Sequence, residues 1–226
     1  MSDPPPIRLA LQDEHWVVAV KPAGLSTVAP PGGDSLESRL RIQLDRRGDY
    51  LAAVHRLDRE TTGLVALALT KRAARSLSDQ FAHGQVVKQY VADSAPVDSP
   101  VGTHFRWVDR LQKRADQPVV DLVAAGVSAQ DDDQDGKLAE TSATVIEHAA
   151  AMTRWRLEPR TGRTHQLRVQ MAHRGHPILG DPVYGKPSNA TITPEMRLFA
   201  VSLALRQPIT LRSVEVRVDD VAPRLT

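Results

Sequence analysis

Residues 54–69 read VHRLDRETTGLVALAL, a polar turn that runs directly into an apolar segment. The apolar run from Leu64 to Leu69 has the length of a buried strand, and Gly63 before it permits a tight turn or a close backbone approach. Loops that abut rigid strands commonly present catalytic groups. The stretch therefore predicts a buried strand with a functional loop at its beginning.

Other strands and helices are predicted on both sides of this stretch. Apolar runs or alternating apolar residues predict strands at 15–20, 86–92, 143–146, 152–157, 199–205 and 214–218. Apolar residues at helical spacing predict helices at 36–44, 73–84 and 164–174. The proline-containing stretch 93–118 is expected to be irregular. Because no regular βαβ rhythm is present, the predicted fold class is α+β, with a mixed, largely antiparallel central sheet flanked by helices and loops.

The chain of 226 residues is long enough for one medium-sized domain with a substantial core. We expect residues 1–14 to form a flexible N-terminal tail and residues 15–226 to form a single catalytic domain. The absence of cysteine excludes a disulfide scaffold, a thiolate nucleophile and a cysteine-based zinc site. No apolar run is long enough to span a bilayer, and the first residues lack a signal-peptide core. A cytoplasmic monomer without membrane attachment is therefore expected.

The distribution of charge is more informative than the net charge of +2. Six arginines fall within residues 154–174, and six more fall within residues 39–59. Arginine suits bidentate phosphate contacts and stacking on bases, which favours a nucleic-acid partner. The alternative is that these arginines lie on the solvated faces of ordinary helices and strands.

Two groups of residues invite a metal-site interpretation, and both fall short of it. The acidic run at residues 131–135 lacks the alternation and the distal glutamate of a calcium-binding EF-hand loop, so a solvated loop is expected there. His165, His173 and His176 lie on different predicted elements, and no carboxylate completes a known zinc-ligand spacing. No metal site is predicted.

Asp58 is the candidate catalytic residue of the loop at residues 54–63. Arg56 and Arg59 are its neighbours in sequence, and a cation close in space would hold the carboxylate ionised and orient it. An ionised, positioned carboxylate can act as a nucleophile or as a base at a sugar carbon. The alternative is a salt-bridged surface turn, since surface ion pairs are common.

A second polar segment, residues 158–170, reads EPRTGRTHQLRVQ. Thr161 or Thr164 is expected to cap the helix that follows, and Leu167 is expected to face the core. Arg168 lies next to Leu167, so it can border the core and pair with a catalytic carboxylate. An ordinary capped amphipathic helix is the alternative.

Together, these segments resemble the RluA-type pseudouridine synthase family. Residues 55–63, HRLDRETTG, and residues 161–169, TGRTHQLRV, are similar to two signatures of that family. Shorter similarities lie at residues 20–25, 88–90, 175–185 and 198–210. The resemblance spans roughly residues 15–212 in the family's order.

The resemblance implies an enzyme that isomerises specific uridines of rRNA or tRNA to pseudouridine by flipping the base out of the helix. Neither a cofactor nor a metal is implied. Asp58 matches the catalytic aspartate, which either attacks C1′ or removes the proton at C2′. The matched substrate-binding residues are Arg56, which fills the gap left by the flipped base, Tyr90, which stacks on the uracil, Leu167, which lines the pocket, and Arg168, which pairs with the aspartate.

The chain departs from the family pattern at a few positions. Gln170 stands where histidine is common, Gly84 stands where arginine is frequent, and the acidic run at 131–135 resembles an insertion. No S4-like basic module precedes the domain, so RNA docking is expected to rest on this domain alone. Two other functions remain open: a catalytically silent RNA-binding protein on the same scaffold, and a nucleoside or glycoside hydrolase. Such hydrolases usually use paired carboxylates, and Glu60 is the obvious neighbour of Asp58.

Overall fold

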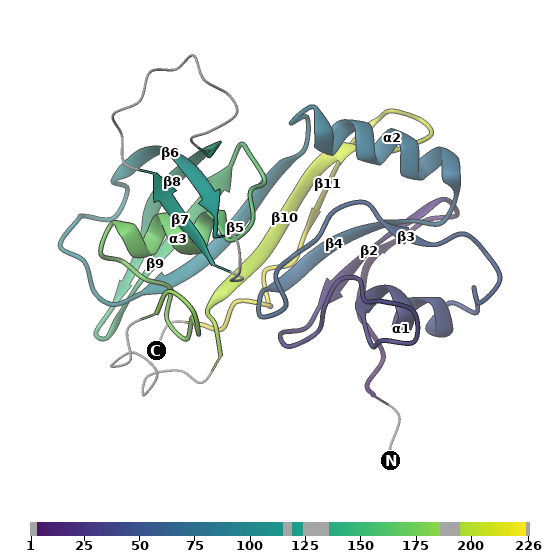
Figure 1. Ribbon diagram of the computed structural model, residues 1–226, viewed down its shortest axis with the longest axis horizontal. Helices are drawn as coiled ribbons and strands as arrows, with labels where there is room; N and C mark the ends of the chain where they lie inside the picture. Colours follow the sequence, from purple (N-terminus) through teal and green to yellow (C-terminus); the bar gives the residue numbers. More distant parts are fainter. Residues whose placement is uncertain (1–3, 115–118, 124–135, 186–194, 225–226) are drawn as a thin grey trace. The chain divides into compact units, whose positions relative to one another are not determined.

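The computed structural model describes residues 4–114, 119–123, 136–185 and 195–224. The chain divides into two compact units, and the helices and strands of each are labelled in Figure 1. The first unit comprises Met1–Lys88 and Phe199–Val221, and the second comprises Gln89–Leu198 and Ala222–Thr226. The expected single catalytic domain over residues 15–226 therefore stays a prediction.

The first unit is built on a mixed sheet. Its strands lie in the order β1 (Leu9–Gln12), β2 (Trp16–Lys21), β4 (Thr62–Ala68), β10 (Leu198–Arg206) and β11 (Ser213–Arg217), and the short β3 (Ala52–Ala53) also pairs with β4. The pairing of β4 with β10 is parallel, whereas β1–β2, β2–β4, β3–β4 and β10–β11 are antiparallel.

Two helices accompany this sheet, α1 (Leu36–Gln43) and α2 (Lys71–Ala82). The Thr70 hydroxyl caps α2 by accepting a hydrogen bond from the backbone N–H of Ala73. Ala73 and Leu77 on one face of α2 are fully buried and pack in a core cluster with Leu64 of β4. Burying a leucine side chain stabilises a fold by about 1.5–3 kcal/mol, so the helical spacing of apolar residues explains where α2 lies.

The second unit has an antiparallel sheet. The strand order is β5 (Val87–Ser94), β9 (Met152–Pro159), β8 (Lys137–Ala149), β6 (His104–Lys113) and β7 (Val120–Val123). The helix α3 (Gln166–His173) packs on this sheet through Leu167 and Met171, which lie in one core cluster with Trp107 and Trp155. The expectation that Leu167 faces the core is confirmed.

Three local expectations were wrong. Residues 93–118 are not all irregular, because His104–Lys113 forms β6, whose two-residue alternation is obscured in the sequence by nearby prolines. The expected tail at residues 1–14 contains β1, and the backbone N–H of the buried Ile7 donates to the side chain of Gln43. The N-cap of α3 is His165, with no side-chain capping bond, instead of Thr161 or Thr164.

The predicted α+β class with a mixed, largely antiparallel sheet is confirmed. Of the helices in the described parts of the chain, none has the length and apolar character needed to cross a membrane. The expected acidic loop at residues 131–135 lies outside the described residues.

Candidate active site

Asp58 lies in the loop between β3 and β4 of the first unit. Its side chain is half-buried, between the exposed Arg56 and Arg59, and its backbone C=O accepts a hydrogen bond from the N–H of Thr61 at 3.1 Å. Leu57, one residue earlier, is buried. The loop thus presents Asp58 at a tight turn, and the residue before it is anchored in the core.

Gly63 explains why the loop enters β4 where it does. Its φ is +128°, a value that L side chains rarely adopt, and a Cβ added here would lie 2.2 Å from the carbonyl oxygen of Ala200 on β10. No other residue fits a backbone approach this close. The expected role of Gly63 in a close backbone approach is confirmed.

Two polar side chains from residues 21–27 hold the backbone of the loop. The Thr27 hydroxyl accepts a hydrogen bond from the N–H of Leu57 at 3.1 Å and donates to the C=O of Leu57 at 3.2 Å. The Lys21 ammonium donates to the carbonyl oxygens of Pro22, Leu25 and Arg59 at 2.8–2.9 Å. These contacts anchor the residues before and after Asp58.

Lys21 is a buried cation close to the acidic residues of the loop. Its burial lowers the pKa of the ammonium from 10.5 to about 8, against the opposing effect of the negative charges of Glu60 and Asp58. The group therefore remains mostly protonated at neutral pH. The strand predicted at residues 15–20 stops one residue before Lys21, and the cations predicted beside Asp58 were Arg56 and Arg59.

His55 at the start of the loop is a neutral side chain with a structural contact. Its Nε2 accepts a hydrogen bond from the N–H of Ala66, and its ring stacks on Phe81 with centroids 4.3 Å apart. Burial first, and then the positive charge of Lys88, lower the pKa of His55 to about 3. The proton of the neutral ring is therefore on Nδ1, since Nε2 accepts.

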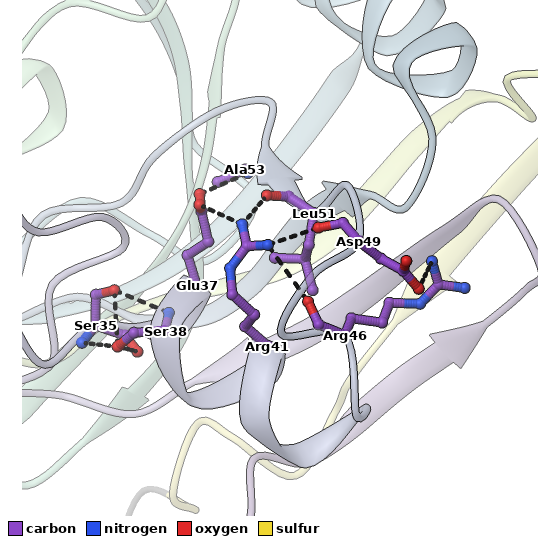
Figure 2. A network of polar contacts seen from close by, with 8 residues as sticks. All are labelled: Ser35, Glu37, Ser38, Arg41, Arg46, Asp49, Leu51 and Ala53. Carbon is purple, nitrogen blue, oxygen red and sulfur yellow. Dashed lines mark hydrogen bonds and ion pairs between the residues drawn. The ribbon is translucent and has the colours of Figure 1, made fainter. Parts of the chain in front are cut away.

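A polar network on α1 holds the segment that leads into the loop (Figure 2). The Arg41 guanidinium donates to the C=O of Leu51 at 2.6 Å and to the C=O of Asp49 at 2.7 Å. Glu37 accepts from the N–H of Ala53 at 3.2 Å and pairs with Arg41 at 3.3 Å. The helix itself begins with a reciprocal capping box between Ser35 and Ser38.

This network changes the interpretation of the arginines at residues 39–59. Arg41 bonds backbone carbonyls, Arg39 pairs with Asp34, and Arg46 lies 3.9 Å from Asp49. These three arginines have structural partners. They are therefore weaker candidates for phosphate contacts than the clustering of arginines in the sequence indicated.

In the second unit, Arg168 of α3 forms a buried bidentate ion pair with Asp181. Both N···O distances are 2.8 Å, and the guanidinium lies 5.3 Å from the centroid of the Tyr184 ring. Burial acts to raise the pKa of Asp181, but Arg168 and two backbone N–H donors outweigh it, so the pKa lies below its usual value. The expected pairing of Arg168 with Asp58 joins residues of the two units and stays a prediction.

Asp181 was not predicted from the sequence as a partner of Arg168. The signal was the stretch at residues 180–185, GDPVYG, where the carboxylate also accepts from the N–H groups of Val183 and Tyr184. Tyr90, the candidate stacking residue, lies on β5 opposite Leu157 of β9 and packs half-buried against the core of the second unit.

Polar residues in and next to α3 are engaged within the second unit. Gln170 is fully buried, accepts from the Thr141 hydroxyl at 2.6 Å and donates to Asp109 at 2.6 Å. His165 is hydrogen bonded to the Tyr184 hydroxyl at 3.0 Å, and His176 packs against Trp155. Among the described residues there is no group of three or more His, Asp or Glu side chains that could hold a metal ion.

Comparison with known proteins places these residues in a family context. The sequence model described as RNA pseudouridylate synthase matches residues 15–173. The chain is 35% identical over 214 residues to the dual-specificity RNA pseudouridine synthase RluA of Salmonella typhi, covering 92% of this chain and 90% of that relative. It is 33% identical to the ribosomal large subunit pseudouridine synthase D of Nitrosomonas europaea, covering 90% of this chain and 59% of that relative.

Solved structures agree at the level of the fold. The human RNA pseudouridylate synthase domain containing 1 superposes with a TM-score of 0.77 at 24% identity, covering 97% of this chain and 86% of the human one. The structure of human RNA pseudouridylate synthase domain containing 4 superposes with a TM-score of 0.74, also at 24% identity, covering 96% of this chain and 88% of the human one.

Proposed function

The chain belongs to the RNA pseudouridylate synthase family and acts on uridine in RNA, and we propose that it modifies rRNA or tRNA with Asp58 as its catalytic residue. The observation that carries the assignment of Asp58 is its place in the sequence HRLDRETTG, on a loop whose backbone is anchored on both sides. A half-buried carboxylate held in one position suits an attack that must reach a single atom of the substrate.

The reaction requires that the uridine leave the stack, because its glycosidic carbon is otherwise inaccessible. Unstacking costs a few kcal/mol, and Arg56 is placed to offset part of this cost, since it is exposed two residues before Asp58. Tyr90 stacks on the extruded uracil, as aromatic side chains do on unpaired bases. Leu167 lines the pocket for the base.

The chemistry breaks the N–C glycosidic bond, turns the uracil and forms a C–C bond. Asp58 either attacks C1′ or removes the proton at C2′. We propose from the motif alone that Arg168 pairs with Asp58 and keeps it ionised. No electrons are gained or lost overall and no group leaves, so the balance of the reaction requires neither a redox cofactor nor a metal.

We also propose the target RNA, the location in the cell and the oligomeric state. The S. typhi relative is named a dual-specificity enzyme and the N. europaea relative is named for the large ribosomal subunit, which supports rRNA or tRNA as the target. A cytoplasmic location is proposed because both RNA classes are used there. A monomer is proposed, and its mass in solution would test it.

Tritium release tests the function directly. RNA that carries tritium at C5 of uridine loses it to water only when C5 becomes the glycosidic carbon, so the enzyme should release tritium and leave pseudouridine in the chain. RNA binding without tritium release would favour a catalytically silent RNA-binding protein. Release of free uracil would favour a hydrolase. Mapping pseudouridine in RNA from cells with and without the gene would identify the target.

A further inference from the structure

We propose that Thr27 and Lys21 are positioning residues that set the location of the Asp58 carboxylate by bonding the backbone on either side of it. This inference rests on the proposed catalytic role of Asp58. Both side chains lie outside the loop, Lys21 at the end of β2 and Thr27 in the segment that follows. Their part in turnover goes beyond their part in the fold.

Thr27 holds the residue before Asp58. Its hydroxyl is both acceptor and donor to Leu57, and Thr27 is only 3% exposed. Both polar groups of the Leu57 backbone are thus satisfied by one side-chain oxygen. Replacing the hydroxyl with a methyl group would leave both groups without this partner, and the backbone would have to shift to find another.

Thr27 is itself fixed by the start of α1. The N–H of Glu37 donates to the C=O of Thr27 at 3.2 Å, and the N–H of Leu36 donates to the C=O of Ser26 at 2.9 Å. The helix therefore fixes the main chain from which the hydroxyl extends. A helix terminus, one hydroxyl and the catalytic loop form a continuous series of hydrogen bonds.

Lys21 holds the residue after Asp58. It is the last residue of β2, lies opposite Gly63 of β4 and is fully buried. An ammonium has three N–H donors, and the three carbonyls of Pro22, Leu25 and Arg59 match that number. The lysine therefore ties the turn at residues 22–25 to the loop.

The role of the two anchors is positional, since neither side chain is assigned to the reacting atoms. A displacement of about 1 Å in a catalytic group can lower the rate by about 100-fold. Loss of an anchor should therefore lower kcat more than it raises KM, because the RNA-contacting residues Arg56 and Tyr90 remain. A purely structural residue would instead lower the unfolding temperature without changing the kcat of the folded enzyme.

The test compares Thr27→Val, which keeps the shape but removes the hydroxyl, with Thr27→Ser, which keeps the hydroxyl. We expect Thr27→Val to lower kcat by about 10- to 100-fold with KM within about twofold, and Thr27→Ser to stay within about threefold of the wild type. The Leu57 amide should also exchange faster with solvent in Thr27→Val, a readout independent of activity.

Thr70→Ala is the matched control, because it removes a hydroxyl that caps the start of α2 by accepting from the N–H of Ala73. It should lower the unfolding temperature and leave kcat unchanged. A folded Thr27→Val enzyme with kcat within twofold of the wild type would overturn the proposal. If Thr27→Val does not fold, Thr27→Ser decides, because a tenfold loss of kcat in folded Thr27→Ser would show that a retained hydroxyl does not position the loop.

Asp58→Asn, assayed in parallel, separates the positioning role of Thr27 from the proposed catalytic role of Asp58. If Asp58→Asn is inactive and Thr27→Val is normal, the positioning role fails and the catalytic role of Asp58 stands. If Asp58→Asn is active, the catalytic assignment fails regardless of Thr27.

Discussion

The imidazole of His55 replaces a backbone acceptor in the ladder between β3 and β4, because its Nε2 accepts the hydrogen bond of the Ala66 N–H at 3.0 Å. The backbone pairing ends one residue earlier, where the N–H of Val54 donates to the C=O of Ala66 at 3.3 Å. At His55 the main chain turns away to form the loop with Asp58, and the side chain completes the pairing. The site therefore depends on a histidine that does not titrate near neutral pH.

His55 should make the stability of the enzyme sensitive to acid. Its pKa is about 3 in the folded chain and 6.5 in the unfolded chain, so between these values the unfolded chain binds more protons. The contribution of His55 is present above pH 6.5 and is lost as the pH falls towards 3. The unfolding temperature of His55→Gln, which keeps an acceptor and does not titrate, should fall less between pH 7 and pH 4. If the unfolding temperatures of the wild type and of His55→Gln fell equally with pH, His55 would not be the source of the acid sensitivity.

Removing Arg41 should destabilise the segment that leads into the loop. Arg41→Ala loses hydrogen bonds to the carbonyls of Leu51 and Asp49 and the ion pair with Glu37, so we expect a loss of about 1–3 kcal/mol in the free energy of unfolding. Urea titration measures it. Arg72→Ala, on the exposed face of α2, is the control and should change stability by at most about 0.5 kcal/mol. Equal effects of the two changes would mean that the network of Figure 2 adds no stability.

Gly63→Ala should be strongly destabilising for two reasons. The new Cβ would meet the carbonyl of Ala200 at 2.2 Å, and the residue would be strained at a φ of +128°. Gly102 also has a positive φ, +92°, but its Cβ would meet nothing within 4 Å, so Gly102→Ala measures strain alone. Backbone strain of this kind costs about 1–3 kcal/mol. In thermal unfolding, the loss of stability caused by Gly63→Ala should exceed the loss caused by Gly102→Ala by at least about 1 kcal/mol. A smaller loss at Gly63 would refute the close packing of β4 on β10.

Asp181→Asn should weaken a buried ion pair. The change removes the negative charge from a pair with Arg168 whose side chains are 4% and 0% exposed, so we expect a loss of about 3 kcal/mol in the free energy of unfolding. Asp121→Asn in the exposed pair with Arg114 is the control, with an expected loss of at most about 1 kcal/mol. A loss at Asp181 as small as that of the control would mean that Arg168 is stabilised by other contacts.

Helices and strands with regularly spaced apolar residues were predicted well from the sequence. The helix over 73–84 and the strand from Leu64 follow directly from the spacing of apolar residues, and they correspond to α2 and β4. The strand His104–Lys113 was missed because prolines nearby indicate irregular backbone. The nearby prolines favour irregular backbone, but pairing with β8 stabilises residues 104–113 as a strand.

The candidate site was predicted at the level of motifs and missed at the level of contacts. Asp58 and Arg168 stand out because their motifs are distinctive. The partners Thr27 and Asp181 do not, since their bonds to Leu57 and Arg168 join residues 30 and 13 positions apart. Such contacts depend on how the chain folds back on itself, which residue spacing does not specify.

One carboxylate, that of Asp58, carries the chemistry in the proposed reaction, and single-turnover tritium release by Asp58→Asn measures its contribution. The substitution keeps the size of the side chain and removes its charge, and with excess enzyme over RNA labelled at C5 of uridine it isolates the chemical step. We expect Asp58→Asn to bind the RNA with an affinity close to that of the wild type and to release no tritium. Release at a rate near that of the wild type would show that Asp58 is not the catalytic residue.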